Sequence, residues 1–314
     1  MADTGEQQTV WTVGRLLDWT TKWFQQKQVE GGRLAAELLL ARAMNCRKID
    51  LYTRFAIEPS EDQRKAFREL VRQAGEHTPI AYLLGLREFF SLEFQVTPAV
   101  LVPRPETEAL AQRMIDLCRS TRERQWRILD LGTGSGCVAV AIAKYAANAV
   151  LVASDISGEA LAVARANIEH HGLSDRIRTV LADGFALPPE CIPESGFDAV
   201  VSNPPYISEA VYENLPPNIR DHEPRLALVP PCSDGLEMYR RFASEAPTVL
   251  AAGGRLLAEI GHDQLGAVRG IFESAGRWDF IGTHRDKTDP HERVVELRVG
   301  EPTRTDRQTA GTAR

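Results

Sequence analysis

The chain has 314 residues, of which 43% are hydrophobic and 25% are charged, and its net charge at pH 7 is −6. It is long enough for one large domain or two ordinary ones, and the acidic balance excludes a protein that binds nucleic acid over its whole surface. The five cysteines are scattered without a Cys-x-x-Cys pair, which predicts reduced thiols and no metal site.

The sequence predicts no export or membrane segment. Its first ten residues are polar and include Asp3 and Glu6, unlike a secretory signal or a transit peptide. The apolar stretch at 34–44 is interrupted by Glu37 and Arg42 and is far too short to cross a bilayer. We therefore expect a cytoplasmic protein without a membrane partner.

The first part of the chain is predicted to be a helical domain over residues 1–84. Apolar residues recur at helical spacing in the segments 13–24, 32–44 and 60–75. The third segment opens with Ser60 and Gln63 in a capping-box arrangement and has a stop signal at Gly75. Such a domain can dock a substrate or can simply add stability, and both interpretations stay open.

A β-hairpin linker is predicted over residues 85–105. The segment "EFFSLEFQVT" alternates apolar and polar residues, as a short hairpin does. Pro103 and Pro105 then end the extended pattern. This linker is also expected to carry surface for recognition.

Strands and helices alternate in the domain predicted over residues 106–300. The alternation indicates an α/β fold with a doubly wound, mostly parallel sheet of seven strands. The last two strands are expected to be antiparallel, because the link between them is too short for a helical crossover. The polar tail at 301–314 is expected to be disordered. The predicted strands are 126–131, 149–156, 177–183, 197–202, 254–260, 278–284 and 293–299.

A glycine-rich loop, "DLGTGSG", follows the first of these strands and opens a helix. Glycines there permit a tight turn and let a ligand approach the backbone at the electropositive start of the helix. A dinucleotide fingerprint would need its third glycine at Cys137, so the spacing favours the pattern of S-adenosylmethionine enzymes. The predicted cofactor-binding residues of this loop are Asp130, Gly132, Thr133, Gly134, Ser135 and Gly136.

Two acidic residues end the next two strands at the same edge of the predicted sheet. Asp155 comes roughly 20 residues after the glycine loop, where a carboxylate can accept hydrogen bonds from ribose hydroxyls. Asp183 is placed to accept from an adenine amino group, with Gly184 and Phe185 alongside the ring. Either Asp alone is typical of a helix cap or a turn, but together with the glycine loop they predict a cofactor site.

The fourth strand ends at that edge in the corner Asn203-Pro204-Pro205-Tyr206. Alone, this tetrapeptide is only a rigid turn. Beside a methyl donor, the Asn203 side-chain oxygen and the Pro204 carbonyl can accept both N–H groups of a planar amine or amide. Tyr206 can stack on that group, so these four residues are the predicted catalytic residues, and Asn203 is also expected to contact the cofactor.

At this point the sequence resembles the HemK/PrmC family of protein-glutamine methyltransferases. The resemblance covers nearly the whole chain, through the blocks "TPIAYLLGLREFFSLEF", "VLVPRPETE", "ILDLGTGSG", "SNPPYI", "HEPRLAL", "DGLEMYRR" and "LLAEIGHDQ" in the order of that family. It implies a class I S-adenosylmethionine-dependent methyltransferase fold, preceded by a small helical domain and a hairpin.

The resemblance also implies an activity. The donor is S-adenosyl-L-methionine, the product is S-adenosyl-L-homocysteine, and the acceptor is the glutamine in the Gly-Gly-Gln loop of class I peptide-chain release factors. It further implies that Arg104, Glu106 and Glu108 help to shape the site, although these residues could equally cap the next helix. The chain departs from the family at Pro230-Pro231-Cys232, where glycines are usual, and at Gly184, where some relatives carry an aromatic residue.

Three other interpretations compete with this one. A sister enzyme methylates a glutamine of a large-subunit ribosomal protein and shares the corner, but "VPRPETE" and "LDLGTGSG" resemble the release-factor enzyme more. Adenine amino methylation of DNA or RNA uses the same corner, but the chain lacks an evident basic tract, and no direct nucleic-acid partner is expected. A non-catalytic adaptor would be expected to lose one of the two motifs. We expect a monomer.

Overall fold

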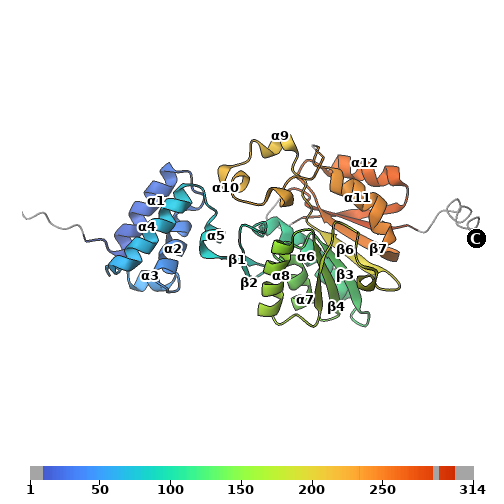
Figure 1. Cartoon of the computed structure of the whole chain (residues 1–314), viewed down its shortest axis with the longest axis horizontal. Coiled ribbons are helices and arrows are strands. Elements are labelled where there is room, and N and C mark those ends of the chain that lie inside the picture. The colour runs from blue at the N-terminus through green and yellow to red at the C-terminus, as the bar shows by residue number, and fades with distance from the viewer. Residues whose placement is uncertain (1–9, 233, 286–289, 301–314) are drawn as a thin grey trace, which may run out of the picture. The chain divides into compact units, whose positions relative to one another are not determined.

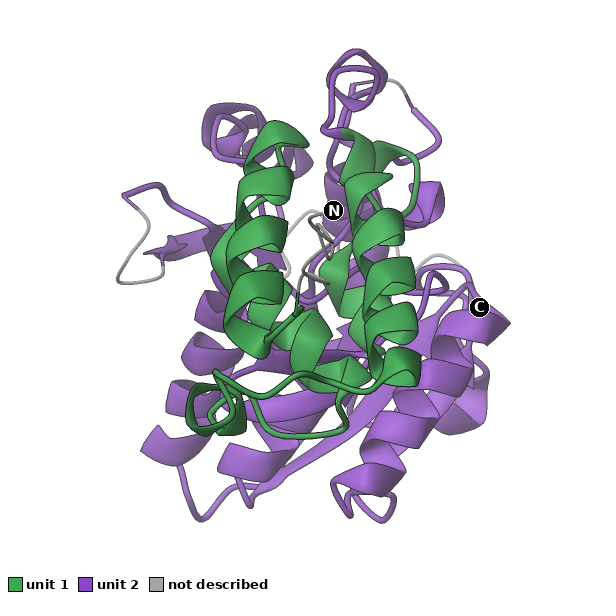
Figure 2. Ribbon diagram, turned by 90° about the vertical axis from the view of Figure 1, so that its left-hand side faces the viewer, with its two compact units in different colours: residues 1–85, 217–222 green, residues 86–216, 223–314 purple. Residues whose placement is uncertain are grey.

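The computed structural model describes residues 10–232, 234–285 and 290–300. The chain divides into two compact units, one of residues 1–85 with 217–222 and one of residues 86–216 with 223–314 (Figures 1 and 2). The tail at 301–314, for which the sequence predicts disorder, lies outside the described residues.

In the described part of the first unit, the regular elements are all helices. Its core contains Leu17, Phe24, Leu39 and Phe67, which are at most 3% exposed. The predicted helical domain is thereby confirmed as a fold. The helices are α1 (Val13–Gln26), α2 (Gly32–Ala43), α3 (Asp50–Thr53), α4 (Glu61–Gly75), α5 (Ile80–Leu84) and α10 (Pro217–Arg220).

Both ends of α4 have identifiable physical causes. The predicted capping box is present, since Gln63 N donates to Ser60 Oγ at 3.3 Å and Ser60 N donates to Gln63 Oε1 at 2.9 Å. Gly75 is the last helical residue, as predicted, but the left-handed residue beyond the helix is His77, with φ +67°. Gly75 instead makes room for Trp23, because an added Cβ would lie 2.0 Å from the indole Cη2.

The second unit carries two sheets and the remaining helices. Its elements are β1 (Leu86–Phe89), β2 (Leu92–Gln95), η1 (Pro105–Thr107), α6 (Glu108–Ser120), β3 (Trp126–Leu131), α7 (Cys137–Tyr145), β4 (Ala149–Asp155), α8 (Gly158–His170), β5 (Ile177–Leu181), η2 (Pro189–Cys191), β6 (Phe197–Ser202), α9 (Glu209–Tyr212), η3 (Arg225–Ala227), α11 (Glu237–Glu245), η4 (Ala246–Thr248), β7 (Leu250–Glu259), α12 (Leu265–Ala275), β8 (Trp278–His284) and β9 (Val294–Val299).

The larger sheet has seven strands in the order β5-β4-β3-β6-β7-β9-β8. Strands β3 to β7 run parallel, whereas β9 is antiparallel to both of its neighbours. The predicted doubly wound sheet with an antiparallel final pair is therefore confirmed. From β3 the chain continues to β4 and β5 on one side and returns to β6 on the other, which makes the β3–β6 boundary a topological switch point.

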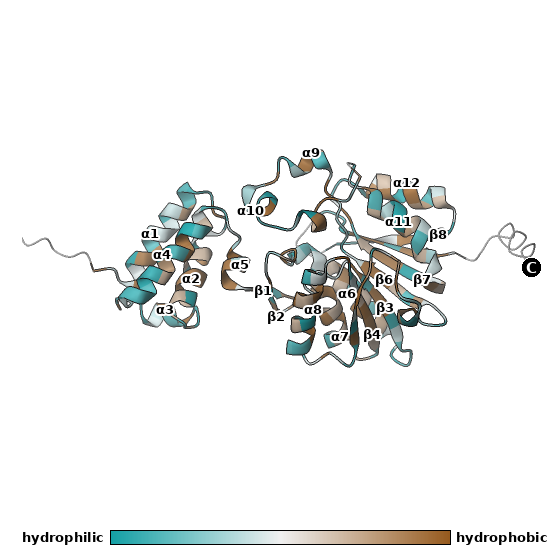
Figure 3. Ribbon diagram, viewed as in Figure 1, coloured by the Kyte–Doolittle hydropathy of each residue, from teal (hydrophilic) through white to brown (hydrophobic). Residues whose placement is uncertain are grey.

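The central strands are apolar on both faces because helices cover both. The strands at the middle of the sheet are drawn in brown, the colour of hydrophobic residues (Figure 3). Adjacent residues of β3 belong to different core clusters: Ile128 packs with α6, α7 and α8, and Leu129 packs with α11 and α12. Burial on both sides fixes the sheet and thus the edge where its parallel strands end.

The predicted hairpin is formed by β1 and β2, which pair antiparallel from Leu86 with Gln95 to Phe89 with Leu92. Its turn residues, Phe90 and Ser91, both have positive φ, at +55° and +58°. This conformation usually selects glycine or asparagine, so the turn is strained.

Three side chains hold the hairpin in place. Glu108 Oε1 accepts from Phe90 N at 2.7 Å, and Tyr145 Oη donates to Phe90 O at 3.1 Å. Asn167, which is fully buried, exchanges hydrogen bonds with the backbone of Gln95 at 2.8 and 3.0 Å. The hairpin is thereby fastened to α6, α7 and α8.

None of the helices formed by the described residues combines the length and the apolar character needed to cross a membrane.

Thr20 in α1 offers a test of packing in the first unit. Its side chain is 1% exposed, and Oγ1 has no hydrogen-bond partner among the described residues. Because a buried hydroxyl without a partner destabilises the folded state, Thr20→Val should raise the free energy of unfolding by about 1 kcal/mol. Urea unfolding of the full chain measures this difference, and a variant less stable than wild type would contradict the prediction.

Candidate functional site

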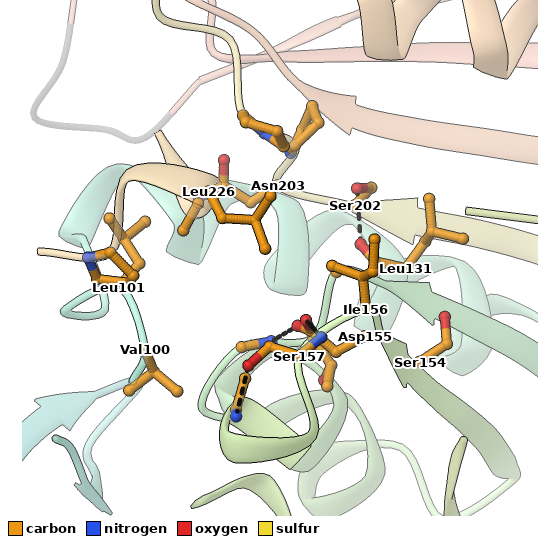
Figure 4. A pocket seen from close by; sticks show the side chains of 18 of the residues that line it. Val100, Leu101, Leu131, Ser154, Asp155, Ile156, Ser157, Ser202, Asn203 and Leu226 are labelled. Atoms are coloured by element: carbon orange, nitrogen blue, oxygen red, sulfur yellow. Dashed lines mark hydrogen bonds between the residues drawn. The ribbon is translucent and has the colours of Figure 1, made fainter. Parts of the chain in front are cut away.

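A cavity of about 270 Å³ opens at the switch point of the larger sheet. Residues that follow β3, β4, β5 and β6 line it, as expected where the carboxyl ends of parallel strands diverge. In Figure 4, Asp155 and Ile156 border one side of the cavity, and Val100, Leu101 and Leu226 border another. Its volume is close to the lower end of the range for small-molecule sites, roughly 300 Å³.

The loop after β3 turns back through two left-handed glycines. Gly132 has φ +71° and Gly134 has φ +55°. A Cβ added to either would meet no heavy atom within 4 Å, so open space lies beside both Cα atoms. The amides of Gly132 and Thr133 each donate to Ser154 O at 2.9 Å, which fastens the loop to β4. A ligand can therefore approach this backbone closely.

Gly136 has a different structural role from Gly132 and Gly134. It precedes α7 with φ +80°, and an added Cβ would lie 3.3 Å from Ala164 Cβ of α8. Among the described residues, the cavity lining includes Thr133 and Ser135 but not Gly136. Gly136 therefore allows close packing of α7 against α8, which sets the direction of the helix that the loop opens.

Asp130 ends β3 as a buried carboxyl, with 2% of its surface exposed. Its Oδ2 accepts from Thr133 Oγ1 at 2.6 Å, and the carboxyl also accepts from the Ala139 amide in the first turns of α7. Burial raises the pKa of Asp130 to about 7; the hydrogen bonds oppose this rise, and the negative charge of Asp155 adds to it. Asp130 thus holds the loop and the helix start together.

Asp155 ends β4 and accepts two backbone hydrogen bonds. Gly134 N donates to Oδ2 and Ser157 N donates to Oδ1, each at 2.9 Å (Figure 4). Each carboxylate oxygen keeps a further lone pair for a ligand hydroxyl. The next residue, Ile156, is 50% exposed and lines the cavity with an apolar face. Its role could not be foreseen, because one apolar residue after a strand is not a specific signal.

Asp183 and Gly184 follow β5 and line the cavity, together with Arg241 from α11. Asp183 Oδ1 accepts from Arg241 Nη1 at 2.8 Å. Gly184 has φ +56°, and an added Cβ would lie 2.2 Å from Arg241 Nη2. The guanidinium therefore lies directly over Gly184, a contact that joins distant parts of the chain and that the sequence analysis missed.

Phe185 does not line the cavity. It is 7% exposed, and its ring packs edge-on against Phe242 with centroids 6.0 Å apart. The cavity lining therefore gives no support to a contact between this ring and an adenine, which stays a prediction. The residue after Gly184 turns toward the core between the sheet and α11, where burial removes its large apolar surface from water.

The corner after β6 lines the cavity through Asn203, Pro204 and Pro205. Ser202 Oγ donates to Leu131 O at 2.7 Å, which ties the end of β6 to the end of β3 (Figure 4). The structure therefore brings the corner after β6 and the glycine loop to one cavity.

Tyr206 is anchored at its hydroxyl group. Its Oη donates to Glu259 Oε1 at 3.2 Å, and its carbonyl oxygen accepts from Gln264 Nε2 at 2.9 Å. Burial and the nearby Glu259 raise the pKa of Tyr206 well above its ordinary value. Tyr206 is not among the described residues that line the cavity, and stacking of its ring on a flat acceptor stays a prediction.

Two residues that the sequence analysis passed over complete this corner. Thr107 ends η1 and donates from Oγ1 to Glu259 Oε2 at 2.6 Å, while Asn203 Nδ2 donates to Thr107 Oγ1 at 3.1 Å. Thr107 is 3% exposed and Glu259, the last residue of β7, is 1% exposed. The sequence does carry a signal for Glu259, because a charged residue follows the buried apolar run 256–258 at the carboxyl end of a strand.

A buried carboxylate also fastens the rim of the cavity. Glu223 is 5% exposed, accepts from Val102 N at 3.1 Å and pairs with Arg104. This contact joins the segments that carry Leu101 and Leu226, which together give the rim an apolar border. Arg104, predicted to shape the site, does so through Glu223.

Other residues of the quoted motifs have distinct positions. Glu108 caps no helix and instead holds the hairpin turn at Phe90. The negative charge of Glu106 contributes to raising the pKa of Glu259. Pro230 and Pro231, where the chain departs from the family, both line the cavity.

Among the described residues, no group of three His, Cys, Asp or Glu side chains could hold a metal ion.

Comparisons with known proteins agree with both units. One family model, described as PrmC N-terminal domain, matches residues 15–85, and another, described as Methyltransferase small domain, matches residues 107–219. The chain is 43% identical over 299 residues to the release factor glutamine methyltransferase of Rhodopirellula baltica, covering 95% of this chain and 99% of that protein. It is 38% identical over 297 residues to the release factor glutamine methyltransferase of Geobacter sulfurreducens, covering 94% and 99%.

One solved structure supports the fold alone. The hMettl16 catalytic domain in complex with MAT2A 3′UTR hairpin 1 aligns with a TM-score of 0.52 and 17% identity, over 69% of this chain and 77% of that one.

The raised pKa of Asp130 predicts a dependence of stability on pH. Its folded-state pKa of about 7 lies above the ordinary value of 3.8, so its contribution to stability is fully present below about pH 4 and is lost as the pH rises toward 7. Asp130→Asn stays neutral at every pH. Between about pH 4 and pH 7, the free energy of unfolding of wild type should therefore fall relative to that of the variant by up to roughly 1.4 kcal/mol for each pH unit. Urea unfolding of both proteins at pH 5, 6, 7 and 8 tests this, and parallel pH curves would contradict it.

Proposed function

The chain belongs to the release factor glutamine methyltransferase family, and we propose that it transfers a methyl group from S-adenosylmethionine to the side-chain amide nitrogen of the glutamine in the Gly-Gly-Gln loop of class I peptide-chain release factors. The names of the relatives favour this acceptor over a ribosomal protein.

The observation that carries this proposal is that one cavity contains the features needed for both reactants. An open glycine backbone and a carboxylate at the end of β4 suit a nucleoside cofactor, while Asn203 and Pro204 at the end of β6 suit a planar amide. Because both groups of residues are fixed to neighbouring strands of one sheet, donor and acceptor meet at a set distance and angle.

The cofactor fits the residues on the β3 and β4 side. The space beside Gly132 and Gly134 admits the amino acid part, and the free lone pairs of Asp155 accept from the ribose hydroxyls. Ile156 presents an apolar surface to the adenine ring, and Asp183 accepts from its amino group. When bound, S-adenosylmethionine supplies an electrophilic methyl group on a positively charged sulfur.

The corner residues act on the acceptor. An amide nitrogen is a poor nucleophile, because its lone pair is delocalised into the carbonyl group. Asn203 Nδ2 is bound to Thr107, so Oδ1 is available to accept from one N–H of the acceptor, and the Pro204 carbonyl accepts from the other. These acceptors orient the nitrogen and stabilise the positive charge that develops on it during transfer. The apolar rim at Leu101 and Leu226 excludes water from the reacting groups.

The first experiment uses methyl-labelled S-adenosylmethionine with three acceptors: a release factor, the same factor with its loop glutamine replaced by alanine, and duplex DNA. We expect label on the first alone, because the corner binds a glutamine amide rather than a flipped base. Label on the DNA, or equal label on both release-factor forms, would show that the corner has been assigned to the wrong planar group.

The division between cofactor residues and acceptor residues predicts two different losses. Asn203→Ala should lower the transfer rate by about a hundredfold or more and change the dissociation constant for S-adenosylmethionine by less than about threefold. Asp155→Ala should raise that dissociation constant by about tenfold or more, because two amides and the ribose lose a charged partner. Isothermal titration and single-turnover labelling separate the two effects.

The matched control for Asn203→Ala is Asn214→Ala. Asn214 is exposed in the turn that follows α9, and its Nδ2 donates to Ala210 O at 2.8 Å. Asn214→Ala should therefore leave the transfer rate and the dissociation constant for S-adenosylmethionine unchanged. Transfer at the wild-type rate by the Asn203 variant would refute the assigned mechanism.

A further inference from the structure

Four side chains form a continuous hydrogen-bonded chain behind the acceptor corner. Tyr206 Oη and Thr107 Oγ1 contact the two oxygens of Glu259 at 3.2 and 2.6 Å, and Asn203 Nδ2 contacts Thr107 Oγ1 at 3.1 Å. This hydrogen-bonded chain joins β7, η1 and the end of β6, which are far apart in the sequence. Of the four residues, Asn203 and Thr107 line the cavity, and Asn203 lies beside Pro204.

When Glu259 is ionised, the hydrogen bonds of these four side chains can be donated in one direction only, from Asn203 to Thr107 to Glu259. A carboxylate only accepts hydrogen bonds, so Tyr206 and Thr107 must both donate to it. Thr107 has a single hydroxyl proton, which is then used on Glu259, so its oxygen can only accept from Asn203. The Asn203 amide must therefore direct its NH₂ group at Thr107, and its Oδ1 remains for the N–H of an acceptor.

The direction is lost when Glu259 is protonated. A carboxyl O–H can donate to Thr107, whose own proton can then be donated to Asn203 Oδ1 after the amide flips. The flipped amide would present its NH₂ group to the acceptor's NH₂ group, and two donors cannot pair. The ionisation of one buried carboxyl thus decides whether Asn203 can hold the acceptor.

The surroundings of Glu259 place this ionisation near neutral pH. Burial raises its pKa to about 7, and the negative charge of Glu106 adds to the rise. Hydrogen bonds from Thr107 and Tyr206 and the positive charge of Arg293 oppose it. From α11, the Tyr239 hydroxyl donates to the backbone oxygen of Glu259 at 2.8 Å, so it does not compete for the carboxylate.

We propose that Glu259 is a positioning residue that acts through Thr107 to fix the amide orientation of Asn203, so that methyl transfer requires the ionised carboxylate. The inference rests on the proposed function, since it concerns the acceptor amide of that reaction. Glu259 does not line the cavity and acts through Thr107, whose hydroxyl determines which atom of Asn203 the acceptor meets.

The first test compares two substitutions of Thr107. Thr107→Val keeps the shape and removes the hydroxyl, so the Asn203 amide can flip; the single-turnover rate at saturating cofactor should fall by roughly tenfold or more. Thr107→Ser keeps the hydroxyl and should restore the rate to within about threefold of wild type. The dissociation constant for S-adenosylmethionine should stay within about twofold in both variants, because the residues proposed to hold the cofactor, which follow β3, β4 and β5, are unchanged.

Thr20→Val is the matched control for Thr107→Val. It makes the same change at a buried threonine in α1 whose hydroxyl has no partner among the described residues. Its transfer rate should equal that of wild type. A Thr107→Val rate within twofold of wild type, or a Thr107→Ser rate as low as that of Thr107→Val, would overturn the inference.

The second test is the pH profile of the single-turnover rate with a release factor as acceptor. For wild type, the rate should rise from pH 6 to a plateau above pH 8, with an inflection near 7, because the ionised form of Glu259 is the active one. Glu259→Gln cannot ionise and should lose the inflection, with a lower plateau. Saturating cofactor removes the effect of Asp130, whose titration acts on the cofactor loop.

Two outcomes separate the inference from the function it rests on. If wild type labels the release-factor glutamine and Glu259→Gln keeps the inflection, the inference is wrong and the function stands. If wild type does not label the release factor, the proposed function is overturned and this inference with it. Should Glu259→Gln fail to fold, the Thr107 pair still decides the question.

Discussion

The site depends on the divergence of the chain on either side of β3. Parallel strands β4 and β5 are added on one side and β6 and β7 on the other, so the connecting loops separate and leave a crevice at the carboxyl edge. The residues proposed for the cofactor follow β3, β4 and β5, and those proposed for the acceptor follow β6, with Glu259 at the end of β7 behind them. Burial on both faces makes this edge rigid, so the sheet itself sets the distance between these two groups of residues.

The same edge concentrates carboxyl groups away from water. Asp130 and Glu259 are at most 2% exposed, and burial raises the pKa of both to about 7. Ionising either group opposes folding, so the site subtracts stability that the apolar core on both faces must offset. Each carboxyl also orders a different part of the site. Asp130 holds the glycine loop to α7, and Glu259 links Tyr206, in the corner after β6, to Thr107 in η1.

The sequence predicts the fold well because the fold follows from local signals. Alternating strand and helix patterns specify the sheet, and the motifs at its carboxyl edge specify the cavity. Interactions between distant segments are not predicted: nothing near Thr107 in the sequence indicates that its hydroxyl contacts Glu259, or that Arg241 lies over Gly184. The spacing of Phe185 after Asp183 fits the cavity as well as the core. Only the packing of α11 against the sheet decides between the two.

The hairpin turn shows how these parts are held together. Phe90 and Ser91 adopt positive φ without the glycine or asparagine that such a turn prefers, so it persists only because its surroundings determine it. Glu108 accepts from the Phe90 amide, and its neighbour Thr107 belongs to the chain that orients Asn203. At the other end of the hairpin, Asn167 Nδ2 donates both to Gln95 O and, at 2.8 Å, to the carbonyl oxygen of Ser135 in the glycine loop. The hairpin thus braces both halves of the cavity, and a change in its turn should be felt by the cofactor loop and the acceptor corner together.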